Sequence, residues 1–187
     1  MHHMARDILR RIKSPFIVLF LNNKGVRYDG LPSFFGRWPD ISNEGKMRIG
    51  EKCSFRSFRL RHRIAVWKDA ELQIGDGAFI NDGVAICATQ SIKIGSNAKI
   101  GDMTYIYDTD FHQVSPDTPT RHSPVSIGNN VWIGAHCMIL AGSSIGDHAV
   151  IAAGSIVTGD IPARSLAAGS PARVIRTLAV PDGWVRR

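Results

Sequence analysis

Aliphatic side chains recur at every sixth position through the C-terminal part of this 187-residue chain. The series runs Ile127, Ile133, Ile139, Ile145, Ile151 and Val157. The residues four places after these are mostly small, namely Val131, Cys137, Ser143, Ala149, Ser155 and Ile161. A period of six does not fit the 3.6-residue period of an amphipathic helix, but it fits a chain that turns a corner every six residues. Three such sides would close one coil of about eighteen residues.

The same rhythm continues upstream, with a two-residue slip between coils. Its earlier members are Ile74, Ile80, Ile86 and Ile92, and then Ile94, Ile100 and Ile106. Ile94 follows Ile74 by 20 residues, whereas Ile127 follows Ile94 by 33, so this coil carries 13 additional residues. They predict a loop that protrudes around residues 107–124. Loops carried on a rigid scaffold often hold functional residues, so chemistry is expected there first.

This pattern predicts an all-β chain folded as a parallel β-helix of hexapeptide repeats. Aliphatic side chains of successive coils would stack inside at the strand spacing of about 4.8 Å, each contributing roughly 1.5–3 kcal/mol. Glycine, Asn and Asp at the corners suit turns with positive φ. Alternation over residues 41–49 predicts one strand that leads into the coils.

Composition narrows the picture. The length favours a single domain. Cys53, Cys87 and Cys137 are odd in number and lack zinc-type spacing, so we expect no disulfide framework, a cytoplasmic location and a packing role for Cys137. A net charge of +7 indicates an anionic partner without identifying it, and no nucleic-acid partner is expected.

The N-terminus predicts an amphipathic helix over residues 4–21. Its apolar run, 16–21, follows basic residues but is too short to span a bilayer, and no signal cleavage site follows it. The helix either packs on the prism or a neighbouring subunit, or makes peripheral contact with a membrane. We expect a helix and linker over 1–24, the β-helix over 25–176 and a C-terminal tail over 177–187.

A second basic segment lies upstream of the regular coils. Arg56, Arg59, Arg61, His62 and Arg63 alternate with Phe55, Phe58 and Leu60. Such clusters are usually solvated faces, and contact with an anionic substrate or phospholipid is the alternative.

The segment SIGNNVWIGAHCMILAGSSIGDHAVIAAGSIVTGDIPARSLAAGSPARVIR, residues 126–176, resembles the C-terminal coils of the hexapeptide acyltransferases. This group holds the galactoside, maltose and many polysaccharide O-acetyltransferases. A looser likeness extends to FINDGVAI (79–86), TDFH (109–112) and GRWPDI (36–41). The resemblance implies a left-handed coil, although right-handed crossovers are the general rule. It does not include the helical cap domain of the maltose and galactoside enzymes, so those two substrates in particular are not expected.

The resemblance implies transfer of acetyl from acetyl-CoA, a cosubstrate, to a hydroxyl of a sugar, polysaccharide or glycolipid intermediate. His112 matches the catalytic histidine, which would act as general base. Asp110 or Asp108 would hold the imidazole tautomer, and either could instead cap a turn. Asn81 matches the acceptor-binding asparagine, and we also assign Asp108 to acceptor binding. At Thr89 the galactoside-type enzymes have an acid, so their acceptor preference does not transfer.

The remaining matches concern the oxyanion and CoA. The amide of Ala135 would stabilise the oxyanion. Trp132 would pack against the pantetheine arm, or else cover a subunit interface. Residues that would line the CoA groove are Ala135, Ala153, Gly154 and Thr158, with Arg173 and Arg176 near the phosphates. Gly159 replaces a lysine of the galactoside enzymes.

Parts of the pattern are also compatible with three other functions. An N-acetyltransferase acting on an amino sugar or its nucleotide remains the main alternative. The γ-class carbonic anhydrases share the coil, but His112, His122, His136 and His148 lack their five-residue spacing, so we expect no metal. A catalytically silent scaffold is a third reading. The resemblance also implies a homotrimer in which the loop reaches a neighbour's groove.

Overall fold

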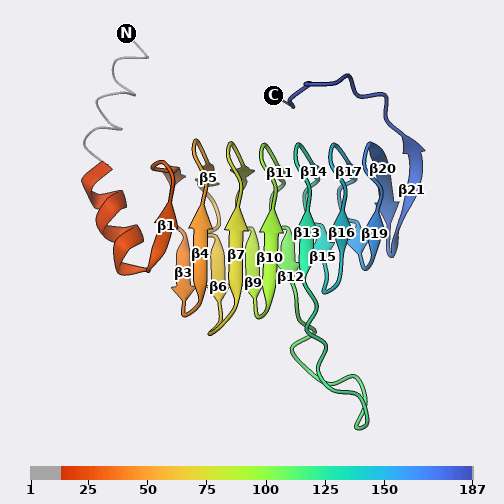
Figure 1. The fold of residues 1–187 in the computed structure, drawn as a ribbon, viewed down its shortest axis with the longest axis horizontal. Helices are drawn as coiled ribbons and strands as arrows, with labels where there is room; N and C mark the ends of the chain where they lie inside the picture. Colours follow the sequence, from red (N-terminus) through yellow and green to blue (C-terminus); the bar gives the residue numbers. More distant parts are fainter. Residues whose placement is uncertain (1–13, 187) are drawn as a thin grey trace.

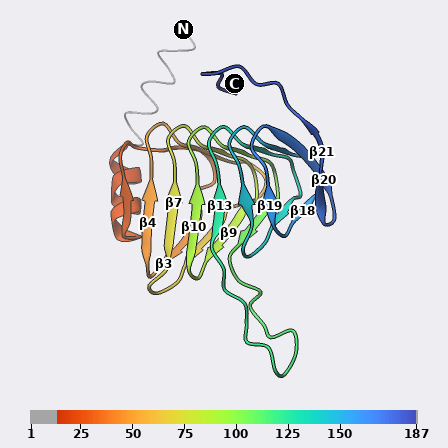
Figure 2. The same ribbon diagram turned by 45° about the vertical axis from the view of Figure 1, so that its right-hand side comes forward.

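The computed structural model describes residues 14–186 and shows a left-handed parallel β-helix with three flat faces (Figures 1 and 2). Face A comprises β1 (Val26–Tyr28), β4 (Lys46–Ile49), β7 (Glu71–Ile74), β10 (Ser91–Ile94), β13 (Val125–Ile127), β16 (Ser144–Ile145) and β19 (Asp160–Ile161). Face B comprises β2 (Ser33–Gly36), β5 (Ser54–Ser57), β8 (Phe79–Ile80), β11 (Lys99–Ile100), β14 (Trp132–Ile133), β17 (Val150–Ile151), β20 (Ser165–Gly169) and β21 (Ala172–Thr177). Face C comprises β3 (Asp40–Asn43), β6 (Arg63–Val66), β9 (Ala85–Ala88), β12 (Tyr105–Tyr107), β15 (Met138–Ile139) and β18 (Ile156–Val157).

The strand register confirms the coil lengths that the sequence predicts. Ile94 pairs with Ile74 on one side and with Ile127 on the other, which are the 20- and 33-residue steps. The aliphatic side chains of face B stack inside the prism and are at most 1% exposed, namely Ile80, Ile100, Ile133 and Ile151. The additional residues between β12 and β13 project from the prism, as Figure 1 shows, so the protruding loop is also confirmed.

Residues 41–49 depart from the expected single strand. They form parts of two strands, β3 and β4, which lie on different faces of the prism. The chain turns at Gly45, where an added Cβ would lie 2.4 Å from the carbonyl oxygens of Trp67 and Ala70. The alternation of buried side chains therefore continues through a corner, which a sequence pattern alone does not reveal.

A helix covers the first coil, and its described part spans residues 14–23. Ile17 and Leu21 are buried in the core, and the ring of Phe20 lies 5.1 Å from that of Trp38. The described part of the helix therefore packs on its own prism, whereas residues 4–13 of the predicted helix lie outside the described residues. Within 14–186, the chain has no helix long and apolar enough to cross a membrane.

The three cysteines are free and buried. Burial raises the pKa of each thiol above its ordinary value. Cys137 donates a hydrogen bond to the carbonyl oxygen of Ala152 at 3.2 Å inside the prism. A protonated, buried thiol is a packing group, because nucleophilic attack requires an accessible thiolate.

Candidate active site

Four of the predicted site residues lie at one edge of the prism. Asn81 follows β8, Ala135 follows β14, and Ala153 and Gly154 follow β17, so all four lie where face B turns into face C. The coils stack these corners above one another. Thr158 and the protruding loop lie instead at the edge between faces C and A.

The corner at Ala135 is held rigidly by its neighbours. The carbonyl oxygen of Ala135 accepts a hydrogen bond from Gly154 N at 2.9 Å, and His136 N donates to Asp102 O at 2.7 Å. A Cβ added at Gly101 would lie 2.5 Å from Ala135 N, so only glycine fits beneath this amide. Within residues 14–186 no hydrogen bond uses the Ala135 N–H. A fixed, unused donor is what stabilisation of an oxyanion requires.

Two side-chain oxygens at the same edge lack partners. Oδ1 of Asn81 and Oδ1 of Asp102 are shielded from solvent, and neither forms a hydrogen bond within the described part of the chain. Buried polar atoms without partners are costly unless a ligand or water satisfies them. The two oxygens are therefore suited to accept hydrogen bonds from a bound molecule. Sequence reasoning identified Asn81 but missed Asp102, whose corner lies one coil further on.

Asp108 anchors the protruding loop, residues 108–123, which we call the arm. Its carboxylate is fully buried. One oxygen accepts from the backbone N–H and the hydroxyl of Thr89, and the other from the N–H groups of Gln90 and Ser91, at 2.7–2.9 Å. In this structure Asp108 therefore orders the base of the arm, and its role toward the acceptor or the imidazole stays a prediction.

The outer part of the arm carries the predicted base. His112 is exposed, and its backbone N–H donates to the carbonyl oxygen of Asp110 at 2.7 Å. The Asp110 carboxylate lies 3.8 Å from Nε of Arg121, across the arm. Phe111, which lies between Asp110 and His112 in the chain, adopts a φ of 60°, and its ring lies 5.4 Å from that of Tyr107. Phe111 thus ties the segment that bears His112 to face C.

A second histidine of the arm, which sequence reasoning did not single out, has an orienting partner. Nδ1 of His122 lies 2.8 Å from Oγ1 of Thr89, and that hydroxyl donates to Asp108 at 2.9 Å. The hydroxyl hydrogen is used by Asp108, so Thr89 accepts from His122 Nδ1–H, which leaves Nε2 as a proton acceptor. Thr89 and His122 are 33 residues apart, which is also the step between β10 and β13. The length of this coil in the sequence was therefore the observation that could have indicated their contact.

Two of the predicted CoA residues on face B line a groove of about 510 Å³. Trp132 and Arg176 form part of it, and the tail after β21 covers one side. The guanidinium of Arg186 lies 5.6 Å from the ring centroid of Trp132. Asn130 fixes this tail, because its Oδ1 accepts from Arg186 N at 2.7 Å. The groove combines apolar walls with two cations, a combination that suits a pantetheine arm and phosphates.

Arg173 and Gly154, which are also predicted CoA residues, are less enclosed. Arg173 lies on β21, is exposed, and donates from Nη1 to the carbonyl oxygen of Ala172 at 2.9 Å. Gly154 has a φ of 74° and open space where a side chain would stand. Within residues 14–186, no group of three His, Cys, Asp or Glu side chains converges to hold a metal ion.

Comparisons with known proteins agree with this architecture. The family described as "Bacterial transferase hexapeptide (six repeats)" matches residues 124–159. The chain is 35% identical over 170 residues to the putative acetyltransferase SAR2635 of Staphylococcus aureus (strain MRSA252), a match that covers 74% of this chain and 83% of the relative. It is 39% identical over 112 residues to the galactoside O-acetyltransferase of Escherichia coli (strain K12), covering 58% of this chain and 55% of that protein.

Among solved structures, the chain resembles the hexapeptide-repeat-containing acetyltransferase VCA0836 of Vibrio cholerae O1 biovar eltor, which was crystallised with acetyl-coenzyme A. The TM-score is 0.61 at 26% identity, and the match covers 90% of this chain and 79% of that one. The chain thus spans most of some relatives but only about half the length of the galactoside enzyme.

Proposed function

This chain belongs to the hexapeptide-repeat acetyltransferase family, and from this membership we propose that it transfers an acetyl group from acetyl-CoA to a hydroxyl of a sugar or glycan acceptor. The observation that carries the proposal is the rigid corner at Ala135, whose N–H is unused, together with the unpartnered amide oxygen of Asn81 two coils away on the same edge. An oxyanion donor and an acceptor-binding group at one edge are two of the elements that acyl transfer to a hydroxyl needs, and the general base is the third.

The proposed reaction has one nucleophilic attack. The acceptor oxygen attacks the thioester carbonyl while His112 takes its proton, and the oxyanion that forms accepts a hydrogen bond from Ala135 N–H. The C–S bond then breaks, and the imidazolium returns the proton to the departing thiolate of CoA. Trp132 and Arg176 would hold the pantetheine and phosphates in the groove on face B.

The arrangement of edges supports a homotrimer. Within one protomer, Ala135 lies at the edge between faces B and C, whereas the arm leaves from the edge between faces C and A. The base and the oxyanion donor are therefore at opposite sides of face C. An assembly in which the arm reaches the corner of a neighbouring protomer would bring His112 to Ala135.

His122 is a second candidate for the base. Its Nδ1 is bound to Thr89 and, through that hydroxyl, to Asp108, whereas the imidazole of His112 makes no hydrogen bond within the described residues. A histidine oriented by a carboxylate is the usual arrangement of a general base. His112 has the better position on the arm by resemblance, so the two histidines must be separated by experiment.

The test measures free CoA thiol released from acetyl-CoA with a panel of glycan acceptors, which includes amino sugars for the N-acetyltransferase alternative. His112→Ala should reduce transfer by about 10²- to 10⁴-fold while acetyl-CoA binding is retained. Gln113→Ala, the adjacent exposed position, is the matched control and should keep full activity. Full activity of His112→Ala together with loss in His122→Ala would move the base to His122.

A further inference from the structure

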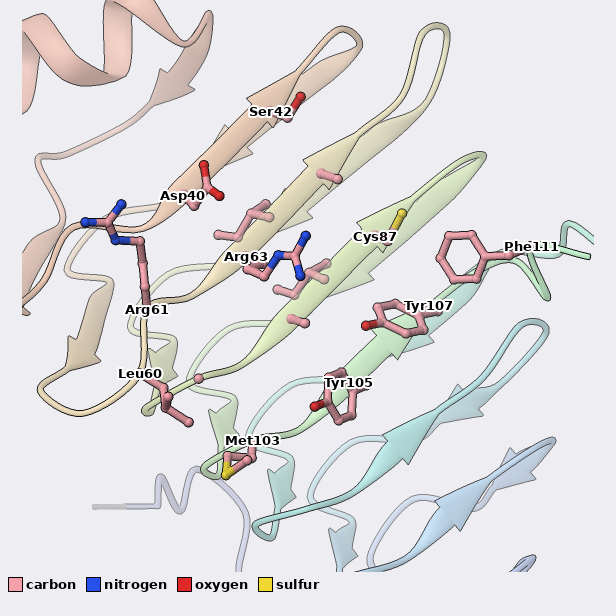
Figure 3. A pocket seen from close by; sticks show the side chains of 15 residues that line it. Asp40, Ser42, Leu60, Arg61, Arg63, Cys87, Met103, Tyr105, Tyr107 and Phe111 are labelled. Atoms are coloured by element: carbon pink, nitrogen blue, oxygen red, sulfur yellow. The ribbon is translucent and has the colours of Figure 1, made fainter.

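A second groove crosses the outer side of face C, between the Ala135 edge and the arm (Figure 3). Its volume is about 450 Å³. Four successive strands of the face, β3, β6, β9 and β12, contribute to it, together with the arm. The side chains with chemical character are Asp40, Arg61, Arg63, Tyr105, Tyr107 and Phe111. We call this the face C groove.

One wall of the face C groove is aromatic. The rings of Tyr105 and Tyr107 lie 5.8 Å apart on β12, and Phe111 continues the row at 5.4 Å from Tyr107. Burial raises the pKa of Tyr107, so its hydroxyl remains protonated at neutral pH and can both donate and accept a hydrogen bond. Flat apolar rings with a polar tip suit a ligand that has both C–H faces and hydroxyls, such as a sugar ring.

The opposite side of the groove is basic. Arg63 projects from β6 into the groove, across β9 from Tyr107, and its positive charge partly opposes the rise in the pKa of that phenol. Arg61 lies two residues earlier at the end of the groove. Within residues 14–186 neither arginine forms an ion pair, and Asp40 is the one carboxylate lining the groove. Two free guanidinium groups against one acid leave a site for an anion.

The face C groove bears on the role of the basic cluster over residues 56–63, which the sequence left open between a solvated face and an anion contact. His62 is fully buried, and the guanidinium of Arg56 lies over the ring of Phe58 at 5.3 Å. The cluster therefore separates into residues with local roles and two arginines, Arg61 and Arg63, that face the groove. These two arginines are therefore the members of the cluster that a ligand in the groove could reach.

The face C groove ends where the arm begins. Phe111 lines the groove and immediately precedes His112, the predicted base. A smaller cavity adjoins the face C groove and shares Ser42 and Ala65 with it. Thr89 and His122, the second histidine of the arm, line this cavity. A molecule bound along the aromatic wall would therefore have one end beside the histidines of the arm.

We propose that the face C groove binds the acceptor, and that the acceptor is a glycan whose sugar carries an acidic group, either a carboxylate or a phosphate. Arg61 and Arg63 bind the acidic group, and the sugar ring lies against Tyr105 and Tyr107. This inference rests on the function proposed above and specifies the substrate class of the same reaction. Carboxylate and phosphate share the chemistry that guanidinium groups recognise, so both are included in the test.

The test measures equilibrium binding of a hexuronate disaccharide, a hexose phosphate and the matching neutral disaccharide to the full chain by calorimetry, without acetyl-CoA. Wild-type protein should bind at least one acidic ligand roughly ten- to a hundredfold more tightly than the neutral one. The double variant Arg61→Gln/Arg63→Gln should lose this preference. Arg27→Gln, which changes an exposed arginine on β1 of face A, is the control and should retain it. Circular dichroism and acetyl-CoA binding verify that each variant is folded.

Three outcomes would overturn the inference. One is equal affinity for acidic and neutral ligands, and another is a preference that survives in the double variant. The third is arginine-dependent binding to phosphatidylglycerol vesicles without binding to soluble acidic sugars, which would assign the arginines to a membrane surface. If one of these outcomes were found together with acetyl transfer to neutral sugars, this inference would fail but the proposed function would stand. Arginine-dependent acidic binding without acetyl transfer would refute the function but keep the site.

Discussion

The coils and the arm are held by different kinds of contact. The coils bury stacked aliphatic side chains between three parallel sheets, whereas the outer part of the arm, residues 110–119, is exposed throughout. The arm is ordered from its base, through the buried Asp108 carboxylate, and from its side, through Phe111 on Tyr107. Repeated packing therefore holds the coils together, whereas only a few specific contacts hold the non-repeating arm against them.

The largest effect is expected from a change inside the coils. Ile133→Ala removes a fully buried side chain and should lower the free energy of unfolding by about 2–5 kcal/mol, because the stacked coils cannot close around the cavity. Val114→Ala is the matched change in the arm, where the side chain is 84% exposed, and should have an effect within about 0.5 kcal/mol. Chemical denaturation followed by circular dichroism measures both. Similar losses in the two variants would contradict the division between coils and arm.

A slightly smaller effect is expected at the base of the arm. Asp108→Ala leaves the N–H groups of Gln90 and Ser91 without an acceptor and should cost about 2–4 kcal/mol. Asp110→Ala, which loses only the exposed 3.8 Å pair with Arg121, should change stability by less than about 0.5 kcal/mol. Hydrogen exchange at Gln90 and Ser91 should accelerate in the first variant alone. Unchanged exchange there would show that the arm is held by other contacts.

The third prediction concerns a buried histidine of the coils. Burial lowers the pKa of His62 to about 4, and neither ring nitrogen has a hydrogen-bond partner in the described chain. The unfolded chain, with an ordinary histidine pKa near 6.5, binds this proton more readily than the folded one. Stability is therefore complete above about pH 6.5 and falls as the pH drops toward 4, by about 2 kcal/mol at pH 5.

His62→Leu removes the titrating group and should flatten this dependence. Urea unfolding of the wild type and of His62→Leu at pH 7.5 and pH 5 measures this dependence. An equal slope in wild type and His62→Leu would assign the acid sensitivity to other groups. The prediction also sharpens the comparison, because it concerns a titratable group that only the packing of the coils buries.

The coils were predictable because their rule is periodic. Each buried isoleucine repeats the environment of the one six residues earlier, and the length of each coil follows from the slips, so Ile94 could be paired with Ile74 and Ile127 in advance. Handedness was not contained in the spacing and came from resemblance. The turn at Gly45 was missed because the burial pattern passes through a corner without interruption.

The site was predictable only in part. Asn81 and Ala135 follow from motif positions, but the face C groove is assembled by strands that are distant in sequence, such as β6 and β12. No local pattern indicates that Arg63 and Tyr107 line one groove. The contact of Thr89 with His122 could in principle have been predicted, because the two residues are one 33-residue coil apart. The course of the chain within the arm is needed to show that their side chains meet.

The two ends of the prism also determine how many coils the molecule can have. A stack of parallel strands presents open backbone groups at each end, and without a cover such ends would join molecules head to tail into filaments. At the first coil the helix over 14–23 lies across the opening, and at the last coil β21 reverses direction and pairs antiparallel with β20 (Figure 1). Because of this reversal, no further parallel strand can add to β20. The stack of coils therefore ends within one molecule instead of continuing into a second one.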